Sequence, residues 1–275
     1  MIKKIILLKD FFTLSLILSL FFILPSCDDT GVLPIFQTSY DSTLGAELNL
    51  QIKADNINYP LLNNASATQY LQGIINEIIK SPEMLYANTF HYKVEIINSN
   101  VINAFATPGG NIYVYKGLLK YLESEAELAA ILAHEVAHAD RRHAVQRIQK
   151  QYGISFLTNL FLPDNAGQLT TFATELLTEL TFLKNSRDDE FEADKYSFKY
   201  LLSTKWYPGA GKEFFNRMLK ESNTSTNIFE EFFSTHPTDS KRIEQLDNLI
   251  KSSNIGEPTE ENLFKTKYAT FKASI

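Results

Sequence analysis

Apolar residues recur along most of the chain at the spacing of helices that pack on one face. Positions three and four apart lie on the same side of an α-helix, so an apolar stripe at that spacing predicts a helix against a core. A cluster of turn residues at 163–167 interrupts the longest of these stretches. The predicted helices cover residues 42–55, 66–80, 124–150, 154–184, 187–202, 209–221 and 239–251.

A different pattern precedes the third helix, where apolar and polar side chains alternate. This alternation is typical of strands, and it predicts three of them at 91–97, 101–107 and 111–115. The residues between them, Asn98-Ser99-Asn100 and Pro108-Gly109-Gly110, are turn formers. The predicted fold class is therefore α+β, with many helices and a small three-stranded sheet beside the helix at 124–150.

That helix contains the sequence LAAILAHEVAHADRRH, residues 128–143. His134 and His138 are four residues apart, so they lie on one helix face and can share one small cation. Glu135 is rotated away from them but stays close enough to reach a metal-bound water. This is the HExxH arrangement of two imidazole ligands and a carboxylate base. The alternative is a helix with two surface histidines, but the apolar stripe around them indicates a buried helix, in which polar groups need partners.

His143 is expected to lie apart from this pair. It follows His134 by nine residues, which is half a turn around a continuous helix. It would then share a solvated basic face with Arg141, Arg142 and Arg147. The third histidine of the metzincin pattern is absent, because its position holds Ala144.

A catalytic zinc takes three protein ligands, so one more must come from elsewhere in the chain. The best candidate stretch is NSRDDEFEADKYSFKYL, residues 185–201. Ser186 can cap a helix there, with Asp189 at its third position. Glu190 and Asp194 then share one face, where Glu190 could ligate zinc and Asp194 could orient a ligating histidine. The alternative is an acidic helix face exposed to solvent.

Four blocks of the chain resemble the HtpX and CAAX-prenyl-protease family of zinc peptidases (peptidase family M48), in the order of that family. They are INAFATPGGNIYVYKGLL, SEAELAAILAHEVAHADRRH, SRDDEFEADKYSFKYL and STHPTDSKRIEQL. The resemblance implies a mostly helical, zincin-type (gluzincin) domain that binds one Zn²⁺ per chain. It implies His134, His138 and Glu190 as ligands, with Asp194 behind them.

The resemblance also brings His236 and Arg242 near the metal. Either side chain could donate a hydrogen bond to the oxyanion of the reaction. His236 could instead occupy the fourth metal position and hold the enzyme latent until substrate displaces it. A further alternative is a surface histidine stiffened by Pro237.

Substrate in this family is expected to bind as an added strand along the edge of the sheet. The edge is expected at 103–106 or at 111–113, so the candidate substrate contacts are Asn103, Ala104, Phe105, Ala106, Gly109 and Gly110. The alternative for the two glycines is a plain hairpin turn.

The N-terminal sequence MIKKIILLKDFFTLSLILSLFFILPSC predicts an export signal at residues 1–26. It has a basic start and an apolar run at 11–24, which is short for a membrane span. Cys27 is the only cysteine, and its place directly after the signal resembles a bacterial lipobox. We expect lipidation there, a tether at 27–43, and one domain at 44–275. The alternative is an uncleaved signal anchor.

The function expected from these features is that of a zinc-dependent endopeptidase in the bacterial cell envelope. It would be held by lipid on the outer membrane, at the periplasmic face or the surface, and would hydrolyse exported or misfolded envelope proteins. An alternative is an assembly factor that binds unfolded outer-membrane proteins, in contact with their assembly machinery, and seldom cuts. An esterase is disfavoured because no serine-centred elbow motif appears, and nucleic-acid binding because basic residues form no long stripe.

Overall fold

The computed structural model of the chain describes residues 31–32, 36–180, 185–222 and 228–275. The expected signal at 1–26 and Cys27 lie outside these residues. Residues Met1–Gln37 and Thr38–Ile275 are separate units, and the fold described below is that of the second unit. Among the described residues, no helix has both the length and the apolar character needed to cross a membrane.

Helices form where the apolar spacing predicts them, and several short ones join them near the C-terminus. The longer helices are α2 (Thr38–Ala54), α3 (Ala65–Ile78), α5 (Glu125–Asp140), α6 (His143–Tyr152), α8 (Ala166–Leu180), α9 (Arg187–Leu201), α10 (Ala210–Ser222) and α12 (Ser240–Ser252). The shorter ones are α4 (Lys116–Tyr121), α7 (Ile154–Leu160), α11 (Glu230–Thr235), α13 (Glu260–Leu263) and α14 (Lys265–Ala273). Single 3₁₀ turns occur at Pro108–Gly110 and Pro163–Asn165.

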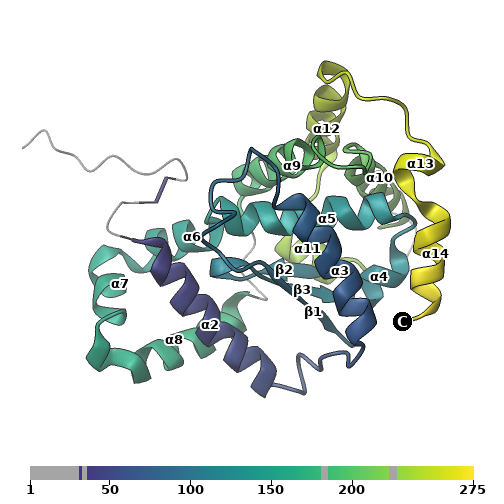
Figure 1. The fold of residues 1–275 in the computed structure, drawn as a ribbon. Helices are drawn as coiled ribbons and strands as arrows, with labels where there is room; N and C mark the ends of the chain where they lie inside the picture. The colour runs from purple at the N-terminus through teal and green to yellow at the C-terminus, as the bar shows by residue number, and fades with distance from the viewer. Residues whose placement is uncertain (1–30, 33–35, 181–184, 223–227) are drawn as a thin grey trace, which may run out of the picture. The chain divides into compact units, whose positions relative to one another are not determined.

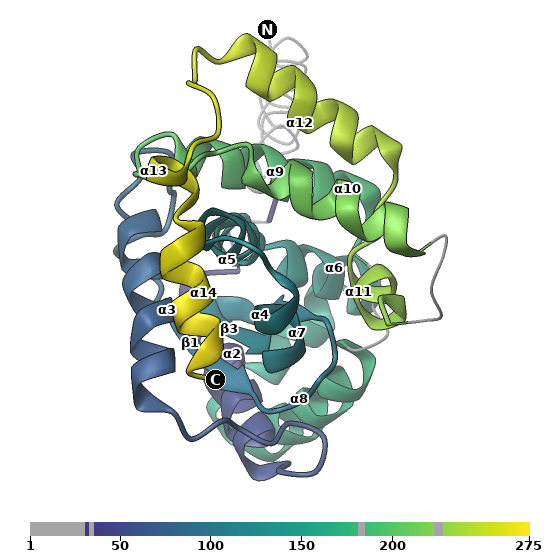
Figure 2. The same ribbon diagram turned by 90° about the vertical axis from the view of Figure 1, so that its right-hand side faces the viewer.

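Helix α5 carries the two motif histidines and is buried along its whole length. It begins after Ser124, whose side chain accepts a hydrogen bond from the backbone N–H of Glu127. The sheet lies on one side of α5, and α9 and α10 lie on the other (Figures 1 and 2). Side chains on every face of α5 are thus removed from bulk water, so its polar groups depend on partners within the protein.

The prediction of one unbroken helix at 124–150 is wrong. Helix α5 ends at Asp140, Arg142 has a left-handed backbone with φ 58°, and α6 begins at His143. A non-glycine residue in that conformation is strained, and here a buried ion pair accompanies it. Arg142 Nη2 lies 2.7 Å from Asp41 Oδ2 on α2.

The sheet has the order β1-β3-β2, with strands β1 (Lys93–Ile97), β2 (Ala104–Ala106) and β3 (Asn111–Tyr115). Strand β1 is parallel to β3, and β2 is antiparallel to it. Strand β3 is therefore central, so its residues 111–113 do not provide the free edge that was one of the two expectations. Strand β2 provides an edge of the sheet.

The cluster of apolar residues at 156–162 lies only partly in the core. Leu157 and Leu160 are buried, whereas Phe156 is 41% exposed and Leu162 is 52% exposed. These residues belong to α7 and the 3₁₀ turn that leads into α8, at the end of the fold where α2 also lies (Figure 1). The short helix α7 packs on its neighbours through the face that carries Leu157 and Leu160, and its other face stays exposed.

The turn between β2 and β3 packs closely on α2. Gly109 and Gly110 have φ angles of 75° and 98°, which side chains rarely adopt. Added Cβ atoms would lie 2.9 Å from the Cα of Ser42 and 3.1 Å from the Tyr92 ring, respectively. A Cβ on Gly45 of α2 would overlap the carbonyl oxygen of Pro108. These contacts support the hairpin-turn alternative for both glycines rather than a contact with substrate.

We predict that Gly45→Ala lowers the free energy of unfolding by about 1–3 kcal/mol, because the methyl group forces α2 away from the turn. Gly73→Ala is the matched control. Apart from its chain neighbours and the nearby backbone of α3 itself, no atom of the described residues lies within 4 Å of a Cβ built at Gly73, and alanine is favoured over glycine in a helix by about 0.5–1 kcal/mol. Urea unfolding of the two variants measures both effects, and equal shifts in the same direction would contradict this account of the packing.

Candidate metal centre

The two motif histidines of α5 meet a carboxylate from α9. The Nε2 atoms of His134 and His138 are 3.0 Å apart. Glu190 Oε2 lies 3.3 Å from His134 Nε2, and Glu190 Oε1 lies 3.3 Å from His138 Nε2. All three side chains are buried. The stretch at 185–201 is thus a helix whose Glu190 faces the histidines, and the alternative of a solvated acidic face does not hold for this residue.

Helix α9 begins at Ser186, as its sequence predicts. The Ser186 hydroxyl accepts from the backbone N–H of Asp189, and the Asp189 carboxylate accepts from the backbone N–H of Ser186. This reciprocal cap fixes the first turn, in which Glu190 lies. The capping box therefore sets the direction in which the carboxylate approaches α5.

His236 joins this group from the end of α11. Its Nδ1 lies 3.1 Å from Glu190 Oε1, and its side chain is 2% exposed. One ligand atom from each of His134, His138, Glu190 and His236 can be chosen so that all lie within 4.8 Å of one another. Burial excludes the alternative of a surface histidine.

The donor set fits zinc, which binds imidazole nitrogen and carboxylate oxygen in a tetrahedral array. Two imidazole nitrogens at 3.0 Å form a hydrogen bond only if one is protonated, whereas one cation accepts both lone pairs. His134 Nδ1 lies 3.0 Å from Asp194 Oδ1, so a proton on Nδ1 would face this carboxylate and leave Nε2 free to ligate. Burial lowers the pKa of His134, but Glu190 and Asp194 outweigh that effect and raise it to about 9. Three imidazole nitrogens and one carboxylate oxygen that face one another form a donor set that zinc can bind.

The expectation that His143 lies on a solvated face is wrong. Its ring is buried, and its Nδ1 lies 2.8 Å from His138 Nδ1. Its Nε2 lies 3.1 Å from Glu192 Oε2 on α9. The left-handed residue Arg142 breaks the helix between the two histidines, so the rotation expected for a continuous helix does not apply. A proton on His143 Nε2, facing Glu192, lets His143 Nδ1 accept from His138 Nδ1 and leaves His138 Nε2 free to ligate.

Arg242 of α12 lies behind the ligands rather than in front of them. Its Nε and Nη2 are each 2.7 Å from an oxygen of Asp194, and its Nη1 is 2.7 Å from Glu190 Oε2. Burial alone would raise the pKa of both carboxyls, but this guanidinium holds each below its ordinary value. All three guanidinium nitrogens of Arg242 are thus engaged by the carboxylates of Asp194 and Glu190. The expected role of Arg242 as an oxyanion donor is not supported, because these contacts make it a positioning residue for the two carboxylates.

Asn185 is a site residue that the sequence reasoning missed. Its Nδ2 donates to Glu190 Oε1 at 2.7 Å and lies 3.5 Å from both His138 Nε2 and His236 Nδ1. The sequence offers only one signal for it, an amide directly before the capping serine of α9. The direction of the Asn185 amide depends on contacts with α5 and α11, so its position in the sequence does not predict its role.

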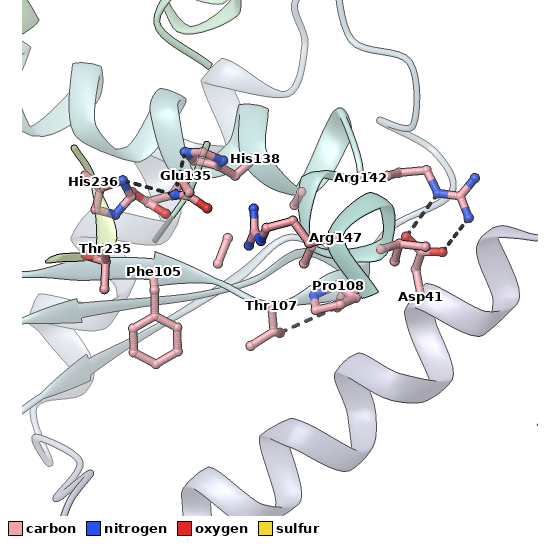
Figure 3. A pocket seen from close by; sticks show the side chains of 15 residues that line it. Asp41, Phe105, Thr107, Pro108, Glu135, His138, Arg142, Arg147, Thr235 and His236 are labelled. Carbon is pink, nitrogen blue, oxygen red and sulfur yellow. Dashed lines mark hydrogen bonds and ion pairs between the residues drawn. The ribbon is translucent and has the colours of Figure 1, made fainter. Parts of the chain in front are cut away.

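Glu135 faces a cleft in front of the ligands. The cleft is lined by Glu135, His138, Asn185, His236, residues 105–108 of the β2–β3 connection, and several residues of α6 (Figure 3). Burial raises the pKa of Glu135, which is 1% exposed. Its Oε1 lies 3.6 Å from His236 Nε2. The predicted base therefore opens onto the cleft beside the ligands, as the HExxH spacing predicts.

Strand β2 runs along this cleft and turns alternate backbone groups toward it. Asn103 and Thr107 bond to β3, so in the antiparallel pattern the N–H and C=O groups of Ala104 and Ala106 face outward. The Asn103 side chain accepts from Ala104 N–H at 2.9 Å, and His236 Nε2 lies 3.1 Å from the Ala104 oxygen. The Thr235 hydroxyl also bonds to Asn103 Oδ1. The end of α11 thus covers the strand edge at Ala104, while Ala106 has no edge partner among the described residues.

Comparison with known proteins agrees with this geometry. The model of peptidase family M48 matches residues 65–250. The chain belongs to peptidase family M48. The match covers α5, α9, His236 and Arg242, which confirms the resemblance found in the four sequence blocks.

The relatives of this M48 chain include named peptidases. It is 29% identical over 201 residues to mitochondrial metalloendopeptidase OMA1 of Schizosaccharomyces pombe, covering 72% of this chain and 58% of that protein. It is 26% identical over 230 residues to the beta-barrel assembly-enhancing protease of Escherichia coli, covering 78% and 46%. Human metalloendopeptidase OMA1 is 31% identical over 172 residues, covering 58% and 32%. The matches to these relatives thus span roughly a third to somewhat more than half of their lengths.

We predict that His143→Ala weakens zinc binding by about 10–100-fold, because His138 loses the partner that fixes its ring and tautomer. His143→Asn should bind zinc more tightly than the alanine variant, since the asparagine Oδ1 takes the place of Nδ1 as acceptor. Competition against a fluorescent chelator measures the affinities, and thermal unfolding of the metal-free forms serves as the control for folding. Equal zinc affinity in the wild type and both variants would remove His143 from the metal centre.

Proposed function

We propose that this M48 chain is a zinc-dependent endopeptidase of the bacterial cell envelope that hydrolyses exported or misfolded envelope proteins. One observation carries the proposal: His138 of the buried His-His-Glu group, the Glu135 carboxylate and the edge strand β2 all border one cleft. A ligand group alone would suit a structural metal. An adjoining base and a strand edge that can pair with a peptide are what hydrolysis of a polypeptide needs.

In the proposed reaction His134, His138 and Glu190 hold the zinc, and Asp194, Arg242 and Asn185 fix those ligands. Bound zinc supplies a Lewis acid that polarises the scissile carbonyl and makes water acidic at neutral pH. Glu135 takes a proton from the attacking water and delivers it to the leaving amine. The raised pKa of the Glu135 carboxyl suits it to holding that proton between the two steps.

We predict that Glu135→Gln retains zinc and fold but loses peptidase activity by several orders of magnitude. The amide keeps the shape of the side chain, yet it takes no proton from water. The measurement is cleavage of casein by protein whose zinc content equals that of the wild type. Turnover near the wild-type rate would remove Glu135 from the mechanism.

For His236, two roles follow from the sequence, a latch on the metal or a donor to the oxyanion. Its contacts favour the latch. Nδ1 faces Glu190 and the other ligands, while Nε2 faces the outward carbonyl of Ala104. With a metal bound, this one ring could act as its fourth ligand and also cover a backbone group that a substrate strand would use. Displacing His236 would free both at once.

We predict that His236→Ala raises basal cleavage of unfolded substrate several-fold, with self-cleavage, if the latch dominates. If His236 acts as an oxyanion donor, the same variant should lose about a hundredfold or more in rate. His91→Ala is the control, because His91 is an exposed histidine. A steady-state rate within about twofold of the wild type would exclude both roles.

The envelope location rests on the sequence of residues 1–27 and on one group of relatives. We propose lipid attachment at Cys27 and contact with the machinery that assembles outer-membrane proteins, in line with the name of the E. coli relative. That name also favours a second candidate function, assistance to assembly with little proteolysis. The Glu135→Gln variant distinguishes the two, because an assembly role would survive it in cells.

A further inference from the structure

One cationic side chain in the cleft has no part in the chemistry proposed above. Arg147, on the second turn of α6, lines the cleft with Glu135 and His138 to one side and Thr107 and Pro108 to the other. Figure 3 shows its guanidinium extending into the space between these two pairs of residues. A positive charge at this point would meet any polypeptide that follows the edge of β2.

Most hydrogen-bond donors of Arg147 are unused within the described residues. A guanidinium has five N–H donors. Nη1 lies 3.4 Å from Asp189 Oδ2, which is a long contact, and that oxygen already accepts the backbone N–H of Ser186 at 3.1 Å. Nε is buried and has no partner. The side chain is only 18% exposed, and burial lowers the pKa of its guanidinium. An arriving anion would therefore relieve the cost of holding this cation away from water.

Arg142 offers a comparison within the same cleft lining. Its Nε lies 3.1 Å from Asp41 Oδ1 and its Nη2 lies 2.7 Å from Asp41 Oδ2. That paired contact neutralises Arg142 and connects α2 to the start of α6. Among the described residues Arg147 has one long ion-pair contact, with Asp189, and no paired contact of this kind, so most of its N–H donors are available to a ligand.

We propose that Arg147 binds an acidic side chain of the substrate, aspartate or glutamate, and so gives the peptidase a sequence preference. The inference rests on the proposed function and adds a substrate class to it. A carboxylate accepts two parallel hydrogen bonds from a guanidinium, which makes arginine the side chain best suited to this recognition. The long contact with Asp189 yields to a better-placed carboxylate.

The direction of β2 predicts where the acidic residue lies in the substrate. Ala104 is next to His236 and the ligands, whereas Thr107 and Pro108 are nearer Arg147 (Figure 3). Antiparallel pairing is the commoner arrangement of strands. In a substrate strand antiparallel to β2, the N-terminal part lies beside Thr107. The acidic residue therefore precedes the scissile bond by roughly two or three residues, each of which spans about 3.3 Å.

The test uses fluorogenic peptides that differ at one position, glutamate against glutamine, scanned along both sides of the cleaved bond. For zinc-loaded wild type we expect kcat/KM to be about tenfold higher with glutamate at one position before the bond. In Arg147→Gln the glutamate-to-glutamine ratio of kcat/KM should fall to about one. In Arg147→Lys this ratio should be intermediate, because lysine keeps the charge but cannot donate two parallel hydrogen bonds. Arg147→Glu should prefer lysine at the same position.

Lys150→Gln is the matched control. It removes a positive charge from the same helix, but Lys150 is exposed and does not line the cleft. Its glutamate-to-glutamine ratio should equal that of the wild type. Zinc content and circular dichroism of each variant establish that it is folded.

A ratio near one at every position in the wild type overturns the inference, as does a preference that persists in Arg147→Gln. A preference after the scissile bond that vanishes in Arg147→Gln overturns the antiparallel direction alone. Failure to cut any peptide would count against the proposed function instead. In that event, fluorescence anisotropy of the same peptides on the Glu135→Gln protein still tests Arg147, because tighter binding of the glutamate peptide must depend on it.

Discussion

The buried guanidinium of Arg242 links the two carboxylates that support the candidate metal centre. Arg242 forms a fork on both oxygens of Asp194 and reaches Glu190 with its third nitrogen, while its other face lies 4.4 Å from the centre of the Phe215 ring. Removing one cation and two anions from water is costly, and close pairing in a fixed geometry offsets that cost. Loss of one partner would leave an uncompensated buried charge, which costs about 3–5 kcal/mol. Helices α12, α9 and α5 are thus aligned by charge as well as by packing.

The rings of His134 and His138 on α5 are oriented by different neighbouring groups. His134 has a carboxylate behind it, and that carboxylate is already neutralised by Arg242. His138 has a second imidazole behind it, and the next group outward is the partly exposed Glu192. Each ring can therefore carry its proton on Nδ1 and point Nε2 at the centre, His134 toward a buried ion pair and His138 toward a chain of groups that leads to the surface. The helix break at Arg142 makes the second arrangement possible, because it brings His143 back toward α5.

Local periodicity predicted most of the helices, all three strands and the core of the site. His134, His138 and the capped start of α9 depend on spacing within one helix, and spacing is visible in sequence. His143 was misplaced because a left-handed residue interrupts the helix, and no local signal at Arg142 indicates the ion pair with Asp41, about a hundred residues earlier. Asn185 was missed, and the contacts of Arg242 with Asp194 and Glu190 were not predicted, because both depend on contacts between helices distant in the chain. The sequence blocks gave the family, but the direction in which these side chains point is a property of tertiary packing.

The narrow β2 edge has a consequence for selectivity. Within the part of the chain that the structure describes, Ala106 alone offers an unpaired backbone N–H and C=O on this edge, and the Ala104 carbonyl becomes available when the His236 ring moves. In the proposed enzyme, a folded protein has no free extended segment that can pair with so short an edge. A very short peptide forms too few hydrogen bonds to displace the His236 ring. A chain that is unfolded over several residues can pair with the edge and can also form enough hydrogen bonds to displace the His236 ring. Such a site would sense the folding state of its substrates through backbone geometry before it reads any of their side chains.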